Sequence, residues 1–414
     1  MLRSLFSGLS GVIASQSELD VLGNNLANVN TTGFKMGRVT FQDTFYQTLR
    51  PASGGGASGF GSDPVQIGSG VAIGWSSAVH GQGALATTGQ PLDMAIDGRG
   101  FLVVTDGART YYTRAGACTL DGDNNLVTVG SHMAIIGWQA DNGTVNTSAP
   151  PGTLAIPLDT PYPPLATRGI ELAGNLDAGA DVYAAGPPPT GGHRLMTVTV
   201  YDSVGAEHLV EITFDKSANN TWDWTATCES ATVGSGTLTF DDTGLPAAPG
   251  VPPQMSITLA NGAQTPLDVS LEFAGLTQFA GDYTANVASQ DGVPSGTIAT
   301  IAVGPDGVIA GKLTNGLDVV LGQIALAIFP NDGGLARAGN SLFGVTPNSG
   351  LPQLDAPGAG SRGIIVSRAL EQSNVDLTQQ FVDMIVTQRA FQASARVIAA
   401  ANRMLDEAIS VAQR

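Results

Sequence analysis

Acidic and amide side chains at residues 121–125 have the spacing that begins a calcium-binding loop. Asp121, Asp123 and Asn125 stand at alternate positions, where such a loop places its first oxygen ligands. Leu126 stands where the loop requires glycine, and His132 stands where it requires a bidentate glutamate. The stretch therefore indicates a hairpin turn, and we predict no metal site there.

Other patterns that could carry chemistry are also incomplete. Residues 81–86 imitate a dinucleotide-binding fingerprint, but residues 87–91 (TTGQP) cannot open the helix that this fingerprint needs. Asp241 and Asp242 precede Thr-Gly and read as a turn. The histidines are scattered, without a second His or Cys at ligand spacing: His80, His132, His193 and His208. We predict that the protein is not an enzyme and has no catalytic residue, metal ligand or cofactor.

Net charge separates the two ends of the chain from its middle. The 414 residues carry 18 basic and 35 acidic side chains, a net charge of −17. Residues 1–50 hold four bases and three acids, and residues 368–414 hold five of each, so residues 51–367 carry −18. An acidic chain lacks the basic patch that phosphate contacts need, and we predict no nucleic-acid partner. We also predict no membrane span, because no apolar run approaches about 18 residues.

Glycine and proline divide the chain in the same way. The 54 glycines and 23 prolines favour turns and strands, but no proline precedes Pro51 or follows Pro357, and no glycine follows Gly363. Cys118 and Cys228 lie far apart in the sequence. They could pair, but without a cysteine framework we favour two free, half-buried thiols.

The two ends are predicted to be long amphipathic helices. Apolar residues step by 3 and 4 through residues 377–409 and through residues 2–26, which predicts helices at about 374–412 and 3–28. Ser373 or Asn374 could cap the second helix. A helical hairpin packed on its own domain is the simpler alternative. However, a two-helix contact buries only part of these stripes, so we expect the pair to pack against further copies of itself. We expect the polymerisation interface along these helix seams: Leu5, Leu9, Val12, Leu19, Leu26, Leu377, Phe381, Met384, Phe391, Ile398, Leu405 and Ile409.

A cleaved signal peptide is the competing interpretation of the N-terminal stretch. Arg3 followed by apolar residues would suit one, but serines and glycines at positions 7–11 interrupt the apolar region, and the helical phase continues past residue 16. We therefore expect no cleavage.

The middle of the chain shows the alternation of antiparallel sheets. Met196, Val198 and Val200 alternate with polar residues, and Trp222 and Trp224 share one apolar face. The predicted fold is mainly β with long terminal helices, and one β-rich domain is inserted in the other. We divide the chain into a helical coiled-coil domain (1–32 and 371–414), a flexible connecting segment (33–72 and 364–370), an inner β domain (73–147 and 288–363) and an outer inserted β domain (148–287).

Long motifs at both ends resemble the flagellar rod and hook axial protein family. Residues 24–35 (NNLANVNTTGFK) are similar to the N-terminal motif of that family, and residues 371–377 with 384–393 are similar to its C-terminal motif. Residues 92–101 and 112–116 resemble the domain shared by rod and hook proteins. Residues 200–205, 277–279, 290–292 and 341–343 resemble the hook branch in particular. The residues that we assign to the family motifs are Asn24, Asn25, Asn28, Asn30, Thr32, Gly33, Phe34, Ser373, Asn374, Val375, Asp376, Gln388 and Arg389.

The resemblance implies a structural subunit that polymerises into a curved tube outside the cell, the universal joint between rod and filament. It implies self-assembly, contacts with the distal rod, the hook cap and the hook–filament junction proteins, and export through the flagellar type III apparatus without cleavage. Terminal helices would form the inner coiled coil, and the β domains the outer walls. Residues 51–72, 148–165 and 285–295 are candidate hinges because they are rich in glycine or proline.

Two alternatives remain open at this point. A distal-rod or other axial protein shares the terminal motifs, but a distal-rod protein would lack a domain like residues 148–285. A secreted adhesive protein whose ends merely dimerise belongs to a different class. Mild proteolysis separates the last alternative from a polymer subunit, which should lose both ends and leave a core near residues 73–365 that no longer forms tubes.

Overall fold

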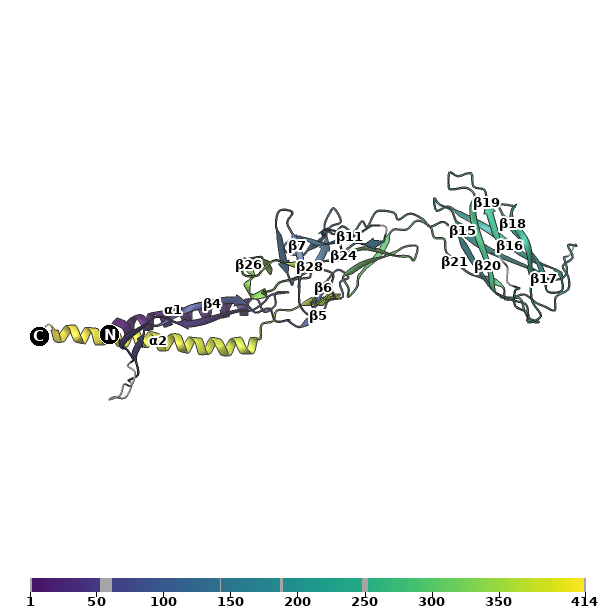
Figure 1. Cartoon of the computed structure of the whole chain (residues 1–414). Coiled ribbons are helices and arrows are strands. Elements are labelled where there is room, and N and C mark those ends of the chain that lie inside the picture. The colour runs from purple at the N-terminus through teal and green to yellow at the C-terminus, as the bar shows by residue number, and fades with distance from the viewer. Residues whose placement is uncertain (1, 53–61, 142, 187–188, 248–251, 413–414) are drawn as a thin grey trace, which may run out of the picture. The chain divides into compact units, whose positions relative to one another are not determined.

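Two compact units make up the computed structural model, which describes residues 2–52, 62–141, 143–186, 189–247 and 252–412. Unit 1 comprises Met1–Pro157, Ile301–Gly311 and Val319–Arg414, and unit 2 comprises Leu158–Thr300 and Lys312–Asp318. Unit 2 is thus an insertion in unit 1, and both terminal helices belong to unit 1 (Figure 1). The predicted fold class, mainly β with long terminal helices, is confirmed. The finer four-part division stays a prediction.

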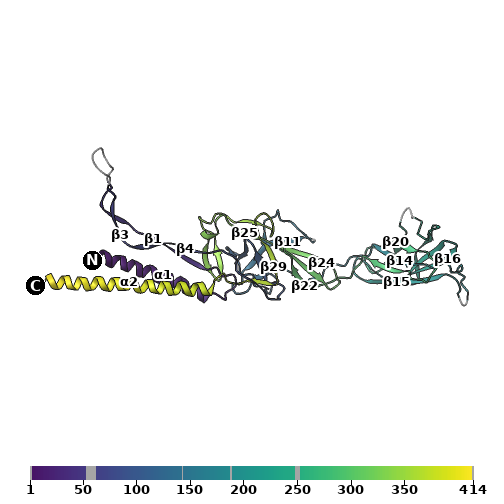
Figure 2. The ribbon, with the colours of Figure 1, turned by 90° about the horizontal axis from the view of Figure 1, so that it is seen from below.

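Helices α1 (Leu2–Ala27) and α2 (Leu377–Ala412) lie side by side in unit 1 (Figures 1 and 2). They are antiparallel, since Asn25 contacts Gln380 while Gly8 approaches Ile398. The cap of α2 is Asp376, whose Oδ1 accepts the N–H groups of Thr378 (2.8 Å) and Gln379 (3.2 Å). The expected caps, Ser373 and Asn374, hold other backbone groups instead. No described helix is long and apolar enough to cross a membrane.

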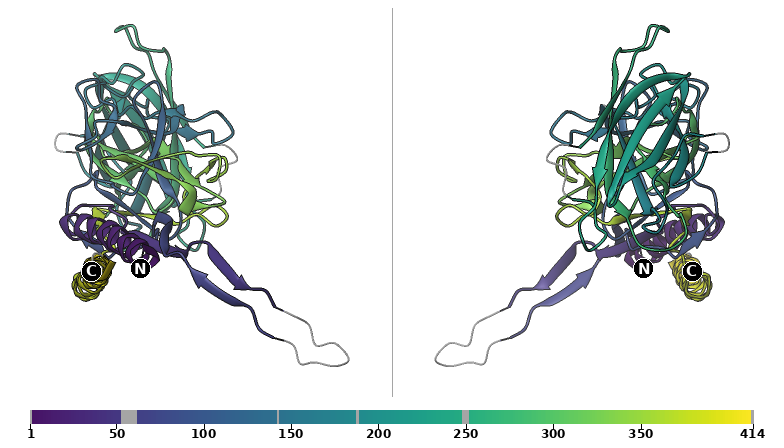
Figure 3. Two further views of the ribbon diagram at one scale, coloured as in Figure 1. Left: turned by 90° about the vertical axis from the view of Figure 1, so that its left-hand side faces the viewer. Right: turned by 90° about the vertical axis from the view of Figure 1, so that its right-hand side faces the viewer.

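Much of the segment expected to be flexible, residues 33–72, is paired β-structure. Strand β1 (Gly37–Asp43) pairs with β4 (Val71–Ala78), and β2 (Tyr46–Arg50) pairs with β3 (Val65–Gly68). The expectation of flexibility came from the glycine-rich stretch. The residues that flank it alternate apolar and polar side chains, as strands do. Residues 53–61, at the centre of the expected linker, lie outside the described part. The two-stranded ribbon of β2 and β3 extends away from the pair of helices (Figure 3).

The β part of unit 1 is a curled sheet with two small two-stranded sheets beside it. Its strands follow the order β22 (Ile298–Val303), β23 (Val308–Leu313), β24 (Asp318–Ile324), β11 (Ala134–Asp141), β7 (Phe101–Thr105), β8 (Thr110–Thr113), β27 (Leu342–Gly344) and β26 (Ala336–Gly339). Attached to this path are β9 (Cys118–Leu120), β10 (Leu126–Thr128), β12 (Thr144–Val145), β13 (Gly152–Thr153), β25 (Leu326–Ile328) and β28 (Gln353–Asp355). The small sheets are β5 (Leu85–Thr87) with β30 (Ala369–Glu371), and β6 (Met94–Asp97) with β29 (Ile364–Ser367); a 3-10 turn spans Asp332–Gly334.

An edge-to-face aromatic cluster fills part of this core. Phe329 lies 6.0 Å from Phe101 and 4.8 Å from Tyr112 between ring centroids. The strands β29 and β30 come just before α2, so the C-terminal segment enters the inner sheets before it becomes helical.

Unit 2 is a pair of four-stranded sheets around one core. One sheet has the order β15 (His193–Tyr201), β16 (Glu207–Ala218), β17 (Thr221–Cys228) and β18 (Ala231–Thr239). The other has the order β19 (Gln254–Ile257), β20 (Leu267–Thr277), β14 (Gly169–Asn175) and β21 (Asn286–Gln290). The alternation read from the sequence is correct here, because Met196, Val198, Val200, Trp222 and Trp224 are all buried in the shared core.

Candidate functional site: the junction of the terminal segments and the helix faces

Glu371 is the centre of a buried ion cluster where the two terminal segments meet the β part of unit 1. Its Oε1 lies 2.6 Å from Nζ of Lys35, and its Oε2 lies 3.2 Å from Nη1 of Arg114. The N–H of Gly83 donates to the same Oε1 at 2.9 Å. Lys35 and Arg114 also donate to backbone carbonyls, among them those of Gly81 and Gly98. These bonds satisfy charges that would otherwise be costly to bury.

Burial dominates the electrostatics of this cluster. It lowers the pKa of Lys35 from its ordinary value, although the contact with Glu371 raises it again in part. Burial likewise lowers the pKa of the Arg114 guanidinium, which also lies over the ring of Phe101. The cluster joins three sequence segments: the end of the N-terminal motif, the end of β8 and the end of β30.

Two asparagines of the family motifs tie the helices to the backbone around this cluster. The side chain of Asn25 donates to the carbonyl of Gly37 (2.8 Å) and to Oε1 of Gln380 (2.9 Å), and it accepts the N–H of Gly37 (2.7 Å). Asn374 accepts the N–H of Met36 at 2.7 Å and donates to the carbonyl of Val79 at 2.8 Å. Each side-chain amide uses both its donor and its acceptor, so each holds a helix terminus against the neighbouring backbone.

Gly33 is required by the close approach of two backbones. Its φ is 67°, and a Cβ there would lie 2.4 Å from the backbone nitrogen of Ala115. Its own N–H donates to the carbonyl of Glu371 at 2.8 Å. A glycine at this point allows the N-terminal segment to pass between β30 and the residues that follow β8.

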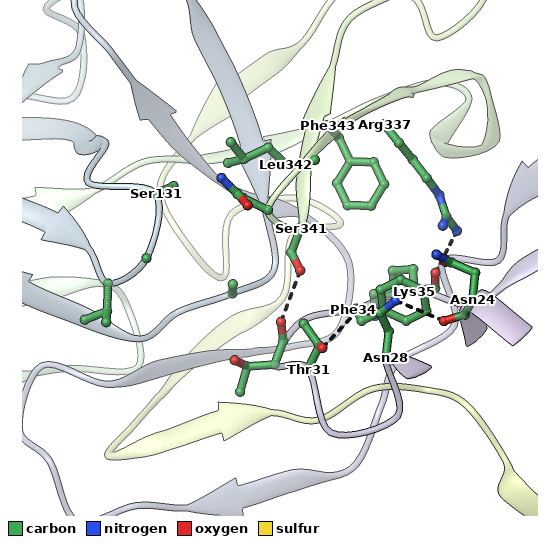
Figure 4. A pocket seen from close by; sticks show the side chains of 16 residues that line it. Asn24, Asn28, Thr31, Phe34, Lys35, Ser131, Arg337, Ser341, Leu342 and Phe343 are labelled. Atoms are coloured by element: carbon green, nitrogen blue, oxygen red, sulfur yellow. Dashed lines mark hydrogen bonds between the residues drawn. The ribbon is translucent and has the colours of Figure 1, made fainter. Parts of the chain in front are cut away.

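A cavity of about 500 Å³, lined by both polar and apolar residues, opens beside the end of α1 (Figure 4). The guanidinium of Arg337 lies over the ring of Phe34 and donates to the carbonyl of Lys35 at 2.7 Å. Ser341 donates to the carbonyl of Thr32 at 3.3 Å. The cavity is therefore the space enclosed by the N-terminal motif, strands β26 and β27, and residues 129–131.

The remaining motif residues are less constrained. Asn28 donates to the carbonyl of Asn24, which is the last turn of α1, and Ser373 accepts the N–H of Val375. Asn30 is exposed, as are Gln388 and Arg389 on α2. The motif therefore divides into a buried junction and a set of surface positions.

Sequence reasoning did not identify the ion cluster. Lys35, Arg114 and Glu371 all lie within the stretches that carry the resemblance, but none stood out as a site residue. The available signal was the scarcity of lysine, since the chain has only Lys35, Lys216 and Lys312. Two of the three, Lys35 and Lys216, are buried.

Small and polar residues form the contact between α1 and α2. Gly8 and Gly11 pack against Ser394, and the residues of α2 on this side recur every seven positions: Gln380, Thr387 and Ala401 are buried, and Ser394 is half-buried. Four of the predicted seam residues of α2, namely Met384, Phe391, Ile398 and Leu405, lie next to them and are half-buried.

Many large apolar side chains of the helices stay exposed. The predicted seam residues Leu377, Phe381 and Ile409 are exposed, and Leu9 is exposed on α1, so the chain itself covers these seam residues only in part. A second stripe of exposed apolar side chains runs along α2: Val382, Val386, Val397, Met404 and Val411. On α1, Phe6, Leu9 and Ile13 form a similar stripe, with Phe6 61% exposed. The helical pair therefore brings small residues together at its contact and leaves many large apolar side chains at least partly exposed.

Titratable side chains do not gather into a metal centre in the described part of the chain. No group of three or more His, Cys, Asp or Glu that could hold a metal ion is found there. At residues 121–125 the structure shows the expected turn, in which Asp121 accepts the N–H groups of Asp123 and Asn125. Cys118 and Cys228 are both free and buried.

Family models match this chain along most of its length. Residues 5–35 match the flagella basal body rod protein model, and residues 366–411 match the flagellar basal body rod FlgEFG protein C-terminal model. Residues 95–147 match the flagellar hook protein FlgE/F/G D1 domain, and residues 175–293 match the flagellar basal body protein FlaE D2 domain.

Curated relatives match the chain from end to end. The flagellar hook protein FlgE of Treponema pallidum is 35% identical over 99% of this chain and 100% of its own length. That of Borreliella burgdorferi is 36% identical over 99% of both chains. A flagellar basal-body rod protein FlgG of Bacillus subtilis is 28% identical over 99% of both chains.

A solved structure shares the fold. The crystal structure of Helicobacter pylori flagellar hook protein FlgE2 aligns with a TM-score of 0.50 at 15% identity. It covers 69% of this chain and all of the solved chain.

Proposed function

The chain belongs to the flagellar hook protein family, and from this premise we propose that it is a structural subunit which polymerises into the tubular flagellar hook. The hook proteins of Treponema pallidum and Borreliella burgdorferi are 35–36% identical to it, and the rod protein of Bacillus subtilis is 28% identical. The match of residues 175–293 to the D2 domain model also favours the hook over the distal rod.

The exposed helix faces are the observation that carries this proposal. Large apolar side chains that remain outside after α1 and α2 have paired need another surface to cover them. A contact that joins one patch to a different patch on the next copy does not close on itself, and it generates a helical polymer. The exposed stripes of α1 and α2 are two such different patches.

We assign the predicted seam residues to this polymerisation interface in two groups. Leu9, Leu377, Phe381 and Ile409 would contact other copies directly, because they are exposed in the single chain. Met384, Phe391, Ile398 and Leu405 would act mainly by holding α2 on α1. The second stripe of α2, which the sequence interpretation did not identify, joins the interface.

The junction would keep the helices attached to the β part while the polymer bends. A curved hook that rotates must let each row of subunits lengthen and shorten in every turn. Small sliding motions between rigid parts provide this change of length. The buried cluster around Glu371 favours a rigid connection between the helices and the inner sheets, so we place the compliant joints at residues 148–165 and 285–295, near the division between the two units.

The finer biological setting follows from the family as a proposal. The subunit would be exported unfolded by the flagellar type III apparatus without cleavage, and it would lie outside the cell. Its neighbours would be the distal rod, the hook cap and the hook–filament junction proteins, besides other copies of itself.

Assembly tests the function directly. Expression in a host strain that lacks its own hook gene should restore curved tubes at the cell surface, seen by electron microscopy, together with swimming. A chain without residues 377–414 is the matched negative control and should form no tubes. Soluble, monodisperse full-length protein in the medium with no tubes would contradict the proposal and favour a secreted binding protein.

A further inference from the structure

The contact between α1 and α2 ends before α2 does. Asn25 lies against Gln380 and Gly8 against Ile398, so the first residues of α1 lie beside residues near position 403 of α2. Residues 404–411 therefore extend past the start of α1 by about 12 Å at 1.5 Å per residue. Figures 1 and 2 show the C-terminal end of α2 reaching beyond the N-terminal start of α1.

This overhang continues the face that packs on α1. Ile409 follows Leu405 and Ile398 along the same side of the helix, at the spacing of the seam. Leu405 is still half-buried, whereas Ile409 is 54% exposed because α1 no longer lies opposite. Met404 and Val411 are exposed as well. The overhang is thus an amphipathic helix end without an apolar partner in its own chain.

A groove on the far side of α1 offers an apolar surface of matching kind. It has a volume of about 280 Å³ and is lined by Ser10, Ile13, Ala14, Val71, Ala72 and Ile73. Ile13 and Ile73 are both substantially exposed, and Phe6 and Leu9 extend the same apolar stripe towards the start of α1. Strand β4 forms one wall because the N–H of Val71 donates to Oγ of Ser10 at 3.2 Å.

Charge favours the same pairing. The overhang exposes Asp406 and Glu407, whereas residues 1–17 carry a single charged side chain, Arg3, which is exposed. The acidic end of α2 would thus approach the start of α1, which carries one basic and no acidic side chain, so α1 would not repel it.

We propose that residues 404–411 of one copy dock into the groove between α1 and β4 of the next copy. The two patches differ and lie on different sides of the helical pair, so the contact is head-to-tail and propagates as a polymer. This inference rests on the proposed function, since it names the partner surfaces within the assembled hook.

Cysteine crosslinking tests the pairing. In a chain with Cys118→Ala and Cys228→Ala, the combined changes Leu9→Cys and Ile409→Cys place one thiol on each patch. Within one chain these positions lie about 20 Å apart along the helical pair, so a short bismaleimide should join only different copies. Isolated hooks should give a ladder of covalent oligomers on a denaturing gel. A chain that carries only one of the two introduced cysteines should give monomer and no ladder.

The outcomes separate this inference from the proposed function. Normal tubes without a ladder would overturn the docking and leave the hook function standing. Failure of the wild-type chain to form tubes would overturn both. Where the cysteine chain itself does not assemble, Ile409→Ser and its neighbour control Ser410→Ala decide: we expect Ile409→Ser to raise the concentration needed for assembly about tenfold or more. Equal assembly of the two variants would overturn the docking.

Discussion

Nζ of Lys35 lies 2.6 Å from Oε1 of Glu371, and both side chains are almost fully excluded from water. The pair joins residues 336 positions apart, the end of the N-terminal motif and the last strand before α2. With Arg114 on the other carboxylate oxygen, one acid holds two bases. The helices are thereby anchored to the inner sheets from both ends of the chain.

Removal of the Glu371 charge should destabilise the junction strongly. Glu371→Gln leaves two buried cations without a counter-charge, and breaking a buried ion pair in this way costs about 3–5 kcal/mol. Hydrogen exchange of peptides from β5 and β30 should speed up accordingly, while peptides from unit 2 should not change. Arg99→Gln is the control, because Arg99 pairs with Asp332 at 3.5 Å on the surface and should cost less than about 1 kcal/mol. Equal effects of the two changes would show that the cluster is not an anchor.

Stability of unit 1 should fall between pH 6.5 and 4 because of His80. Burial, with a smaller contribution from Lys35, Arg114 and Arg337, lowers the pKa of His80 from 6.5 to about 4, although Asp332 acts in the opposite direction. The unfolded chain therefore binds a proton at a pH where the folded chain does not. The contribution of His80 to the free energy of unfolding is fully present above pH 6.5. It decreases by at most about 3 kcal/mol as the pH falls, and the decrease levels off near pH 4.

Replacement of the imidazole isolates this effect. His80 lies edge-on to Phe101 and Phe343, so His80→Leu keeps an apolar contact and removes the titration. Urea unfolding followed by circular dichroism should give midpoints for the variant that fall less than those of wild type between pH 7 and pH 4. Parallel midpoints over this range would mean that the pKa of His80 is the same in the folded and the unfolded chain.

Unit 2 should lose stability only at lower pH, through Asp202. Burial alone would raise the pKa of this carboxyl, but hydrogen bonds from Asn261, His208 and two backbone N–H groups outweigh it and lower the pKa to about 2. The contribution is present above pH 3.8 and is lost as the pH falls towards 2. Asp202→Ala leaves these donors without an acceptor and should cost roughly 1–3 kcal/mol at pH 7.

The effect of Asp202→Ala can be measured peptide by peptide. Hydrogen exchange near pH 7 should accelerate in peptides that cover β15, β16 and the residues around Asn261, and it should not change in α2. Ser256→Ala offers a matched control, because it removes a partner of the exposed Asp268 at the surface of the same unit. A larger effect from Ser256→Ala than from Asp202→Ala would contradict the assignment.

Gly8 should tolerate a methyl group far less well than Gly23 on the same helix. A Cβ at Gly8 would lie 2.9 Å from Cγ1 of Ile398, whereas a Cβ at Gly23 meets nothing within 4 Å. Gly23→Ala should therefore stabilise α1 by about 0.5–1 kcal/mol through backbone entropy. Gly8→Ala should push the helices apart and reduce hook assembly and swimming. Assembly of both variants at the wild-type level would mean that α1 and α2 need not approach closely.

The sequence predicts the helices and unit 2 better than the junction, for physical reasons. Periodicity is a local signal, so α2 and the alternation in β15 and β17 are readable from short windows. The face of α2 is less readable, because stripes at seven-residue spacing overlap: Phe391 packs towards α1 while Val386 does not. The cluster around Glu371 is invisible to periodicity because its three members are distant in sequence, and only the folded chain brings them together.

The two cysteines should report the unfolding of the two units separately. Cys118 in unit 1 and Cys228 in unit 2 are free and buried, so the folded chain shields both thiols from reagents, and burial also raises the pKa of each. Labelling with a maleimide then requires opening of the unit that holds each thiol. In Glu371→Gln we expect Cys118 to react at least tenfold faster while the rate of Cys228 does not change, and in Asp202→Ala we expect the reverse. Mass spectrometry of the labelled peptides measures both rates in one sample. Equal acceleration of both thiols in either variant would show that the two units unfold together.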